Sequence, residues 1–152
     1  MLKKLLKGIG ITILGMFILF AIIATWSNIK SSNYKETAIP YLDTALTDIS
    51  SWELDVLKKY MTPSSLEGVS EEDLAKLVRA FSKMGKLKEF GKYEFTNVSS
   101  KAMAGGDSGT FVTYVVPAKY ENGDATITVT LKEEQDSFSV YHFNLNSMTL
   151  IE

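Results

Sequence analysis

The sequence contains no cysteine among its 152 residues. Disulfide bonds, thiolate metal sites, a cysteine nucleophile and an N-terminal lipid-modified cysteine are therefore excluded. Histidine is nearly absent as well, because His142 is the only one. A metal site would have to be built from carboxylates, and no Asp-x-Asp cluster typical of a calcium loop is present. We therefore expect neither a bound metal nor a cofactor.

An excess of basic charge is also missing. The net charge is −2, and from Ser31 onward 12 Lys and Arg stand against 18 Asp and Glu, which gives −6. Because phosphate binding needs a basic face, we do not expect a nucleic-acid partner. Apolar residues, in contrast, are plentiful: 45% of the chain is hydrophobic and 11% is aromatic. Such a chain can build a core and is unlike a disordered one.

Part of this apolar content forms one block near the N-terminus. From Gly8 to Trp26 there are 19 residues without a charge. As a helix they would extend roughly 28 Å, close to the ~30 Å hydrocarbon core of a bilayer. Lys3, Lys4 and Lys7 precede the block, and positive flanks stay cytoplasmic. The sequence predicts a single-pass anchor with a cytoplasmic N-terminus. The alternative is a cleaved signal peptide, whose apolar stretch is usually only ~7–15 residues long.

Polar residues follow the anchor and mark the start of a folded domain. We divide the chain into an anchor over residues 1–29, a linker over 30–35 and a domain over 36–152. The first helix of this domain is predicted from an apolar stripe with spacings of three and four. That stripe consists of Ile39, Leu42, Leu46 and Ile49.

Capping patterns predict two further helices. The stretch Ser50-Ser51-Trp52-Glu53 has the spacing of a capping box, and the short helix that follows should end before Pro63. Ser70 can cap a third helix, whose dipole the acidic run Glu71-Glu72-Asp73 complements. Gly85 is suited to the C-terminal end of that helix.

After the third helix, the apolar period changes from 3.6 to 2, which is typical of strands. The predicted strands are Tyr93–Ser99, Thr110–Tyr120, Ala125–Glu133 and Phe138–Asn146. Asn122-Gly123 is the strongest hairpin signal, because that turn type needs positive φ at both central positions. The third strand alternates apolar and threonine residues, so one sheet face is core and the other is wet. We expect an α+β fold of about three helices packed on a curled four-stranded antiparallel sheet.

Three segments of the domain have a familiar pattern: Phe81–Lys88, Tyr120–Val129 and Phe138–Asn144. Together with the order of helices and strands, they resemble the cystatin-like, nuclear transport factor 2-like superfamily over about Glu36 to Asn146. The last segment is similar to a Trp-x-Val-x-x-Phe ending, with Phe138 in the tryptophan position. The resemblance implies a cone-shaped domain with a pocket between the sheet and the helices.

The same resemblance implies a cellular setting but no activity. Membrane-anchored versions are accessory subunits of bacterial envelope machines, including type IV secretion. We therefore expect the bacterial inner membrane, with the domain on the periplasmic or extracellular side. Because members include enzymes, ligand binders and scaffolds, the fold itself transfers no function.

The implied pocket would contain the only histidine. The residues expected to line it are Tyr41, Trp52, Tyr60 and His142. Enzymes of the superfamily use an Asp or His in the pocket as a base, and here His142 or Asp43 could take that role if held within hydrogen-bonding reach of a substrate. The alternative is a partly buried structural histidine that is bonded to Asn144 or to the backbone. We expect no catalytic residue.

The last strand is apolar on both faces, which is unusual for a sheet with one wet face. We expect Phe111, Tyr141, Phe143 and Leu145 to share the outer face. Either another part of the protein covers these residues, or they form an interaction patch, and many superfamily members dimerise through this sheet. The leading hypothesis is a noncatalytic envelope domain that binds a partner protein or itself. The alternatives are a small-ligand binder that uses the cone pocket and an enzyme.

Overall fold

A computed structural model describes residues 34–101 and 108–151. The chain divides into two units, Met1–Thr37 and Ala38–Glu152. Among the described residues, no helix has the length and apolar content that a membrane crossing requires. The predicted anchor, Gly8 to Trp26, lies outside them.

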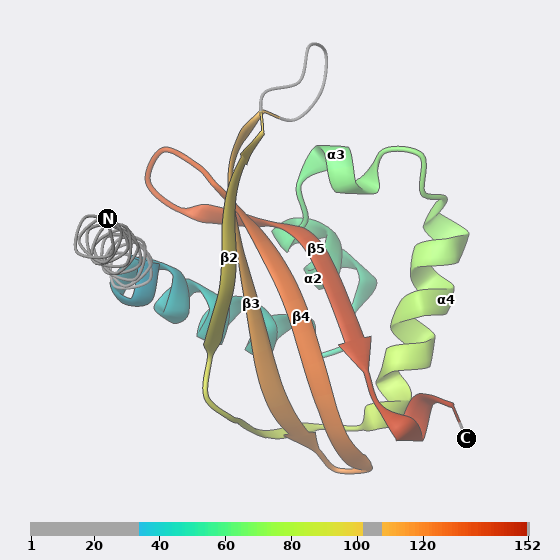
Figure 1. Ribbon diagram of the computed structural model, residues 1–152. Helices are drawn as coiled ribbons and strands as arrows, with labels where there is room; N and C mark the ends of the chain where they lie inside the picture. The colour runs from blue at the N-terminus through green and yellow to red at the C-terminus, as the bar shows by residue number, and fades with distance from the viewer. Residues whose placement is uncertain (1–33, 102–107, 152) are drawn as a thin grey trace, which may run out of the picture. The chain divides into compact units, whose positions relative to one another are not determined.

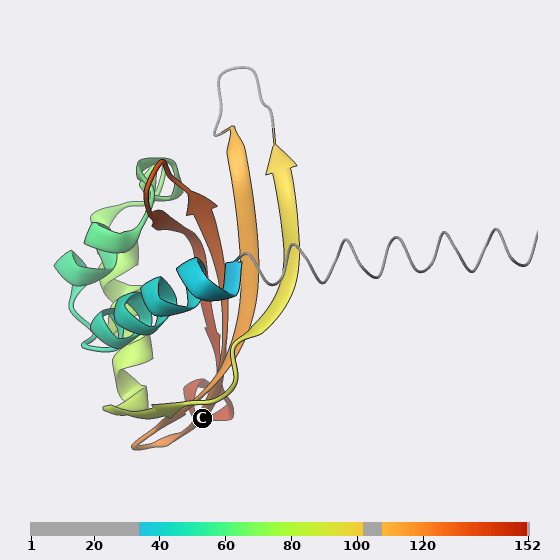
Figure 2. The same ribbon diagram turned by 90° about the vertical axis from the view of Figure 1, so that its left-hand side faces the viewer.

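The second unit is an α+β domain with its helices on one side of a curled sheet (Figures 1 and 2). Its helical elements are a helix over residues 34–49, which begins in the first unit, then α2 (Leu54–Tyr60), α3 (Pro63–Leu66), α4 (Glu71–Phe81), η1 (Ser82–Met84) and η2 (Met148–Leu150). Its strands are β1 (Leu87–Phe90), β2 (Glu94–Lys101), β3 (Gly109–Tyr120), β4 (Gly123–Glu133) and β5 (Phe138–Asn146). The predicted α+β class and the four predicted strands are confirmed, whereas β1 and α3 were missed.

All strand pairs of the sheet are antiparallel, in the order β1-β3-β4-β5, and β2 also pairs with β3. β1 pairs with the end of β3 and β2 with its beginning, so the two lie in line along one side of β3. Pro117 falls between the two ladders and opposes neither strand. A proline is tolerated in this central strand because its missing N–H falls where no ladder needs a donor.

The core lies between the sheet and the helices. Leu42 and Leu46 of the first helix are fully buried there, since they fall on the apolar stripe predicted from the sequence. The sheet contributes the fully buried residues Val112, Tyr114, Val116, Ile127, Val129 and Leu131 to this core. Cross-strand pairs such as Val116 with Ile127 bring these side chains to the same face. The face that carries them is called the inner face below.

The predicted capping box is wrong. α2 begins only at Leu54, and its N-cap residue Glu53 makes no side-chain cap bond. Trp52 is not helical: its φ is 59°, the one positive value among the described residues other than glycine. The Ser50 hydroxyl donates to the carbonyl of Leu46 (2.7 Å) and lies 3.0 Å from the Tyr120 hydroxyl. Tertiary contacts have therefore replaced the local cap.

The hairpin predicted at Asn122-Gly123 exists, but its turn differs from the expected type. Tyr120 pairs with Gly123, so the loop consists of Glu121 and Asn122, and Asn122 has no positive φ. The Asn122 amide nitrogen instead donates to the carbonyl of Lys83 (2.7 Å), and its backbone N–H donates to that of Met84 (3.1 Å). The hairpin thus holds the turn that follows α4.

The indole of Trp52 holds the same turn from the other side. Its Nε1 donates to the carbonyl of Gly85 (2.8 Å), and its ring packs against those of Phe81 and Tyr120. Gly85 has φ 75°, and a Cβ there would lie 2.9 Å from the Glu121 carboxylate. That carboxylate accepts the N–H of the next residue, Lys86, at 2.9 Å. Glycine is therefore needed at this position for both conformation and space.

Replacing Gly85 tests this requirement. Gly85→Ala should destabilise the domain at least about 1 kcal/mol more than Gly68→Ala, because it also displaces Glu121 from its hydrogen bond. Gly68 has φ 80° but nothing within 4 Å of the added Cβ. Its substitution therefore carries only the left-handed backbone cost of about 1–2 kcal/mol. Urea unfolding of both variants measures the difference, and equal losses would refute the steric argument.

Candidate interaction surface

The outer face is the side of the sheet opposite the helices (Figure 2). Directly opposed residues of antiparallel strands share a face. Three rows of side chains cross the outer face on β3, β4 and β5: Thr113, Thr130 and His142; Val115, Thr128 and Asn144; Pro117, Thr126 and Asn146. The hydroxyls of Thr113 and Thr130 lie 3.0 Å apart, within hydrogen-bonding distance. These nine residues, called the central rows below, include no Asp, Glu, Lys or Arg.

An aromatic cluster lies beside the central rows, near the start of β3. The rings of Phe111 and Tyr141 are 4.7 Å apart at 63°. The ammonium of Lys101 lies 5.3 Å from the first ring centroid and 5.6 Å from the second, so it makes cation–π contacts with both. Although Phe111 points to the outer face, only 2% of it is exposed. Two of the four predicted interface residues therefore lie together, and Lys101, which was not predicted from the sequence, joins them.

The other two predicted interface residues, Phe143 and Leu145, are on the inner face. Thr130 opposes His142 and Leu131 opposes Val140, so Tyr141 is an extra residue in β5. Such a bulge reverses the face of every later side chain in the strand. Phe143 consequently packs against Phe81 of α4, with ring centroids 5.8 Å apart. Leu145 is buried opposite Ile127. The predicted shared face was wrong for these two residues.

Of the four predicted pocket residues, the structure brings together only Tyr41 and Tyr60. His142 is exposed and belongs to the outer face. Tyr41, in contrast, packs on the inner-face residue Phe138, with ring centroids 5.7 Å apart. Tyr60 lies beside Tyr41, with ring centroids 6.2 Å apart in an edge-to-face arrangement. Trp52 packs elsewhere, on Tyr120. The prediction that His142 faces a pocket failed because the bulge at Tyr141 turned it outward.

The alternative base, Asp43, has another role. It accepts a hydrogen bond of 2.9 Å from the hydroxyl of Tyr93 and lies on the helix side of the sheet. His142 and Asp43 are thus separated by the sheet and do not form a catalytic pair. Among the described residues, no group of three or more His, Cys, Asp or Glu could hold a metal ion.

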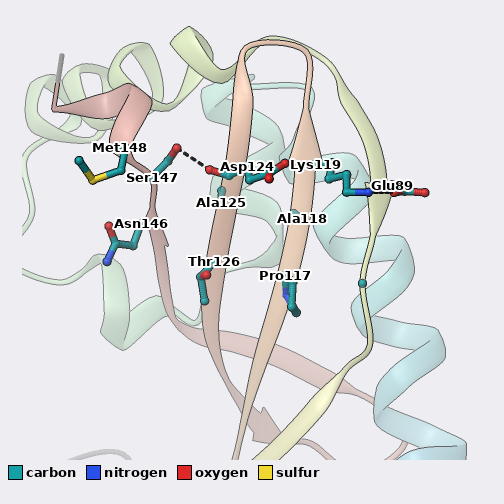
Figure 3. A pocket seen from close by; sticks show the side chains of 11 residues that line it. Glu89, Pro117, Ala118, Lys119, Asp124, Ala125, Thr126, Asn146, Ser147 and Met148 are labelled. Carbon is teal, nitrogen blue, oxygen red and sulfur yellow. Dashed lines mark hydrogen bonds and ion pairs between the residues drawn. The ribbon is translucent and has the colours of Figure 1, made fainter.

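A groove crosses the outer face at the other end of β3 (Figure 3). Its volume is about 570 Å³, and Pro117, Ala118, Ala125 and Thr126 line it along β3 and β4. The ion pair of Lys119 with Glu89, 2.6 Å long, lies at one side. Met148, which is 73% exposed, lies at the other. The groove was not predicted from the sequence, because one side belongs to the unpredicted β1 and the other follows the last predicted strand.

The two groups of the groove's ion pair stabilise each other's charge. The hydrogen bond from Lys119 lowers the pKa of the Glu89 carboxyl, and the same bond raises the pKa of the Lys119 ammonium. Both side chains are well exposed, so water screens the pair and its contribution to folding is small. The pair therefore shapes one side of the groove without making it a strongly charged site.

No protein-family model, curated protein or solved structure matches this chain. The resemblance to the cystatin-like superfamily therefore stays a prediction from the sequence. The candidate site is defined by geometry: the central rows, the aromatic cluster at one end and the groove at the other.

Several tyrosines on the helix side resist ionisation. Burial raises the pKa of Tyr41 to about 12, and the nearby Tyr60 and Glu134 contribute. Burial and the hydrogen bond to Asp43 raise the pKa of Tyr93. The hydrogen bond from Tyr60 to the carboxylate of Asp48 raises the pKa of Tyr60. Each of these phenols titrates at higher pH in the folded chain than in the unfolded one.

These shifts predict alkaline unfolding. An unfolded tyrosine loses its proton near pH 10, whereas Tyr41 keeps its proton in the folded state until about pH 12. Between these values the unfolded state binds fewer protons, so the free energy of unfolding falls as pH rises. Urea unfolding at intervals from pH 8 to 12 should show a plateau to about pH 10 and then a decline. Tyr41→Phe should make that decline shallower, and a flat wild-type profile would contradict the prediction.

Proposed function

We propose that this chain is a noncatalytic, single-pass protein of the bacterial inner membrane. In this proposal, a cone-shaped, cystatin-like domain binds a partner protein, or a second copy of the chain, through the outer face of its sheet. The described residues form a curled α+β domain, and their helices leave the outer face of the sheet uncovered. The cone shape, the superfamily and the anchor belong to the proposal.

One observation carries the proposed binding role: the central rows bear no formal charge, and the helices of residues 34–101 and 108–151 cover the opposite face. Interface centres are likewise depleted of charged residues and enriched in aromatic ones. Tyr141 supplies a partly exposed ring at one end, and the groove offers a concave surface at the other. Charged side chains lie outside the rows, at Lys101, Glu89 and Asp124, where a polar rim is expected.

A small-ligand site is the second candidate function, and the groove is the observation that favours it. Its volume of about 570 Å³ falls within the ~300–1,000 Å³ typical of ligand pockets. An enzymatic role has less support, because His142 and Asp43 lie on different sides of the sheet. Partner binding is preferred because it uses the whole face, including the aromatic cluster that the groove does not reach.

Membrane anchoring rests on the sequence. The 19 uncharged residues from Gly8 to Trp26 are long enough to span the hydrocarbon core, and the lysines before them favour a cytoplasmic N-terminus. This orientation would place the domain outside the cytoplasm.

Introducing a negative charge on the outer face tests the binding role. Thr128→Glu and Tyr141→Glu should weaken association at least about tenfold, because each buries a carboxylate in the proposed interface. The full chain in detergent is measured by light scattering for self-association and by affinity purification with mass spectrometry for partners. Gln135→Glu adds the same charge on an exposed loop and should change neither result. Unaltered mass and partners in Thr128→Glu would refute the proposal.

The absence of cysteine makes the proposed topology directly testable. In Asp136→Cys, the new thiol lies on an exposed loop of the domain and should react with a membrane-impermeant maleimide in cells whose outer layers admit the reagent. In Leu2→Cys, the thiol should react only after lysis, because the N-terminus would be cytoplasmic. The opposite pattern would reverse the orientation, and labelling of neither position before lysis would place the domain in the cytoplasm.

A further inference from the structure

The second surface of interest is an edge of the sheet, separate from the outer face. β2 pairs with β3 from Glu94 to Lys101 on one side. On its other side, no strand among the described residues pairs with it. In an edge strand, every second residue directs its N–H and C=O away from the sheet. β2, which lies at the border of the sheet in Figure 2, therefore offers backbone donors and acceptors on its unpaired side.

This edge has few of the features that usually prevent strand pairing. Proteins commonly protect an edge with charges, proline or a bulge. β2 has a bulge between Phe95 and Asn97, and its charges, Glu94 and Lys101, are at its two ends. From Asn97 to Ser100 there is neither charge nor proline, and the pairing with β3 is regular. A short stretch of regular, uncharged edge is thus left for another strand.

The opposite edge of the same sheet shows what such an edge accepts. There, the extended residue Met61 forms a parallel bridge with Val140 of β5. The N–H of Thr62 donates to the carbonyl of Val140 (2.9 Å), and the Ser65 hydroxyl donates to that of Tyr141 (2.5 Å). This edge is therefore partly covered by a short extended segment of the chain itself. β2 has no equivalent cover among the described residues.

We propose that the β2 edge binds an extended segment of a partner polypeptide by strand addition. Backbone hydrogen bonds would supply the affinity, and alternate side chains the selectivity. Val98 shares the inner face with Val112, so an apolar residue should lie beside it. Asn97 and Ser99 are on the outer face and favour polar neighbours. The partly exposed backbone of this edge is the feature that selects a strand rather than a folded surface.

A peptide that copies residues 109–116 is a suitable probe, because this segment already pairs with β2 inside the domain. Two lysines appended to the peptide keep it soluble. Hydrogen–deuterium exchange of the full chain in detergent, with and without peptide, should show slower exchange confined to residues 94–101. The same peptide with proline in place of its Val112 equivalent, the residue expected opposite Val98, should give no protection, because it lacks a central donor toward β2.

Edge variants separate strand addition from nonspecific adhesion. Asn97→Lys with Ser99→Lys should weaken peptide binding at least about fivefold, since lysines guard an edge. Gln135→Lys with Ser137→Lys adds equal charge on the exposed loop between β4 and β5 and should leave binding unchanged. Thr128→Glu, which tests the outer face, should also still bind the peptide. Protection of the groove or β5 instead of β2, or equal binding by both lysine pairs, would overturn the proposal.

Discussion

The hydrogen bond from the Trp52 indole to the carbonyl of Gly85 joins two parts of this domain that lie 33 residues apart in the chain. It ties the end of the first helix to the turn between α4 and β1, while Asn122 binds that turn from the β3–β4 hairpin. In this arrangement Trp52 has a positive φ. The left-handed backbone conformation costs about 1–2 kcal/mol for a residue with a Cβ. Such strain persists only where surrounding contacts determine the geometry, and here the rings of Phe81 and Tyr120 supply them.

A second constraint is the extra residue at Tyr141, which determines which β5 side chains lie on the outer face of the sheet. Without this bulge, Phe143 and Leu145 would lie on the outer face. With it, they complete the core, and His142 and Asn144 lie outside instead. One inserted residue therefore changes an apolar outer surface into a largely polar one. It also removes the histidine from any interior site, which weakens the enzymatic hypothesis and favours recognition by the surface.

Periodicity was sufficient to predict the long elements, because they follow one period over many residues. It found β3, β4 and β5 closely, but β1 has only four residues and a bulge, too few for a pattern. The bulge at Tyr141 could not be predicted either, since it depends on how β5 pairs with β4. The pairing of Phe111 with Tyr141 was accessible because the bulge changes the face only of the β5 residues that follow Tyr141. The groove was not, because it is formed by segments far apart in the sequence.

The chemistry of the outer face bears on the kind of association it can support. Obligate interfaces are large and apolar, like a domain core cut in two. Here the central rows are mostly threonine and asparagine, and the most apolar side chain, Phe111, is already covered by Tyr141 and Lys101. The stem of a lysine can cover a ring while its charge stays in water, so the free domain exposes little apolar area at this end. The proposed association therefore fits a transient contact, whose affinity would come from shape and hydrogen bonds more than from buried apolar surface.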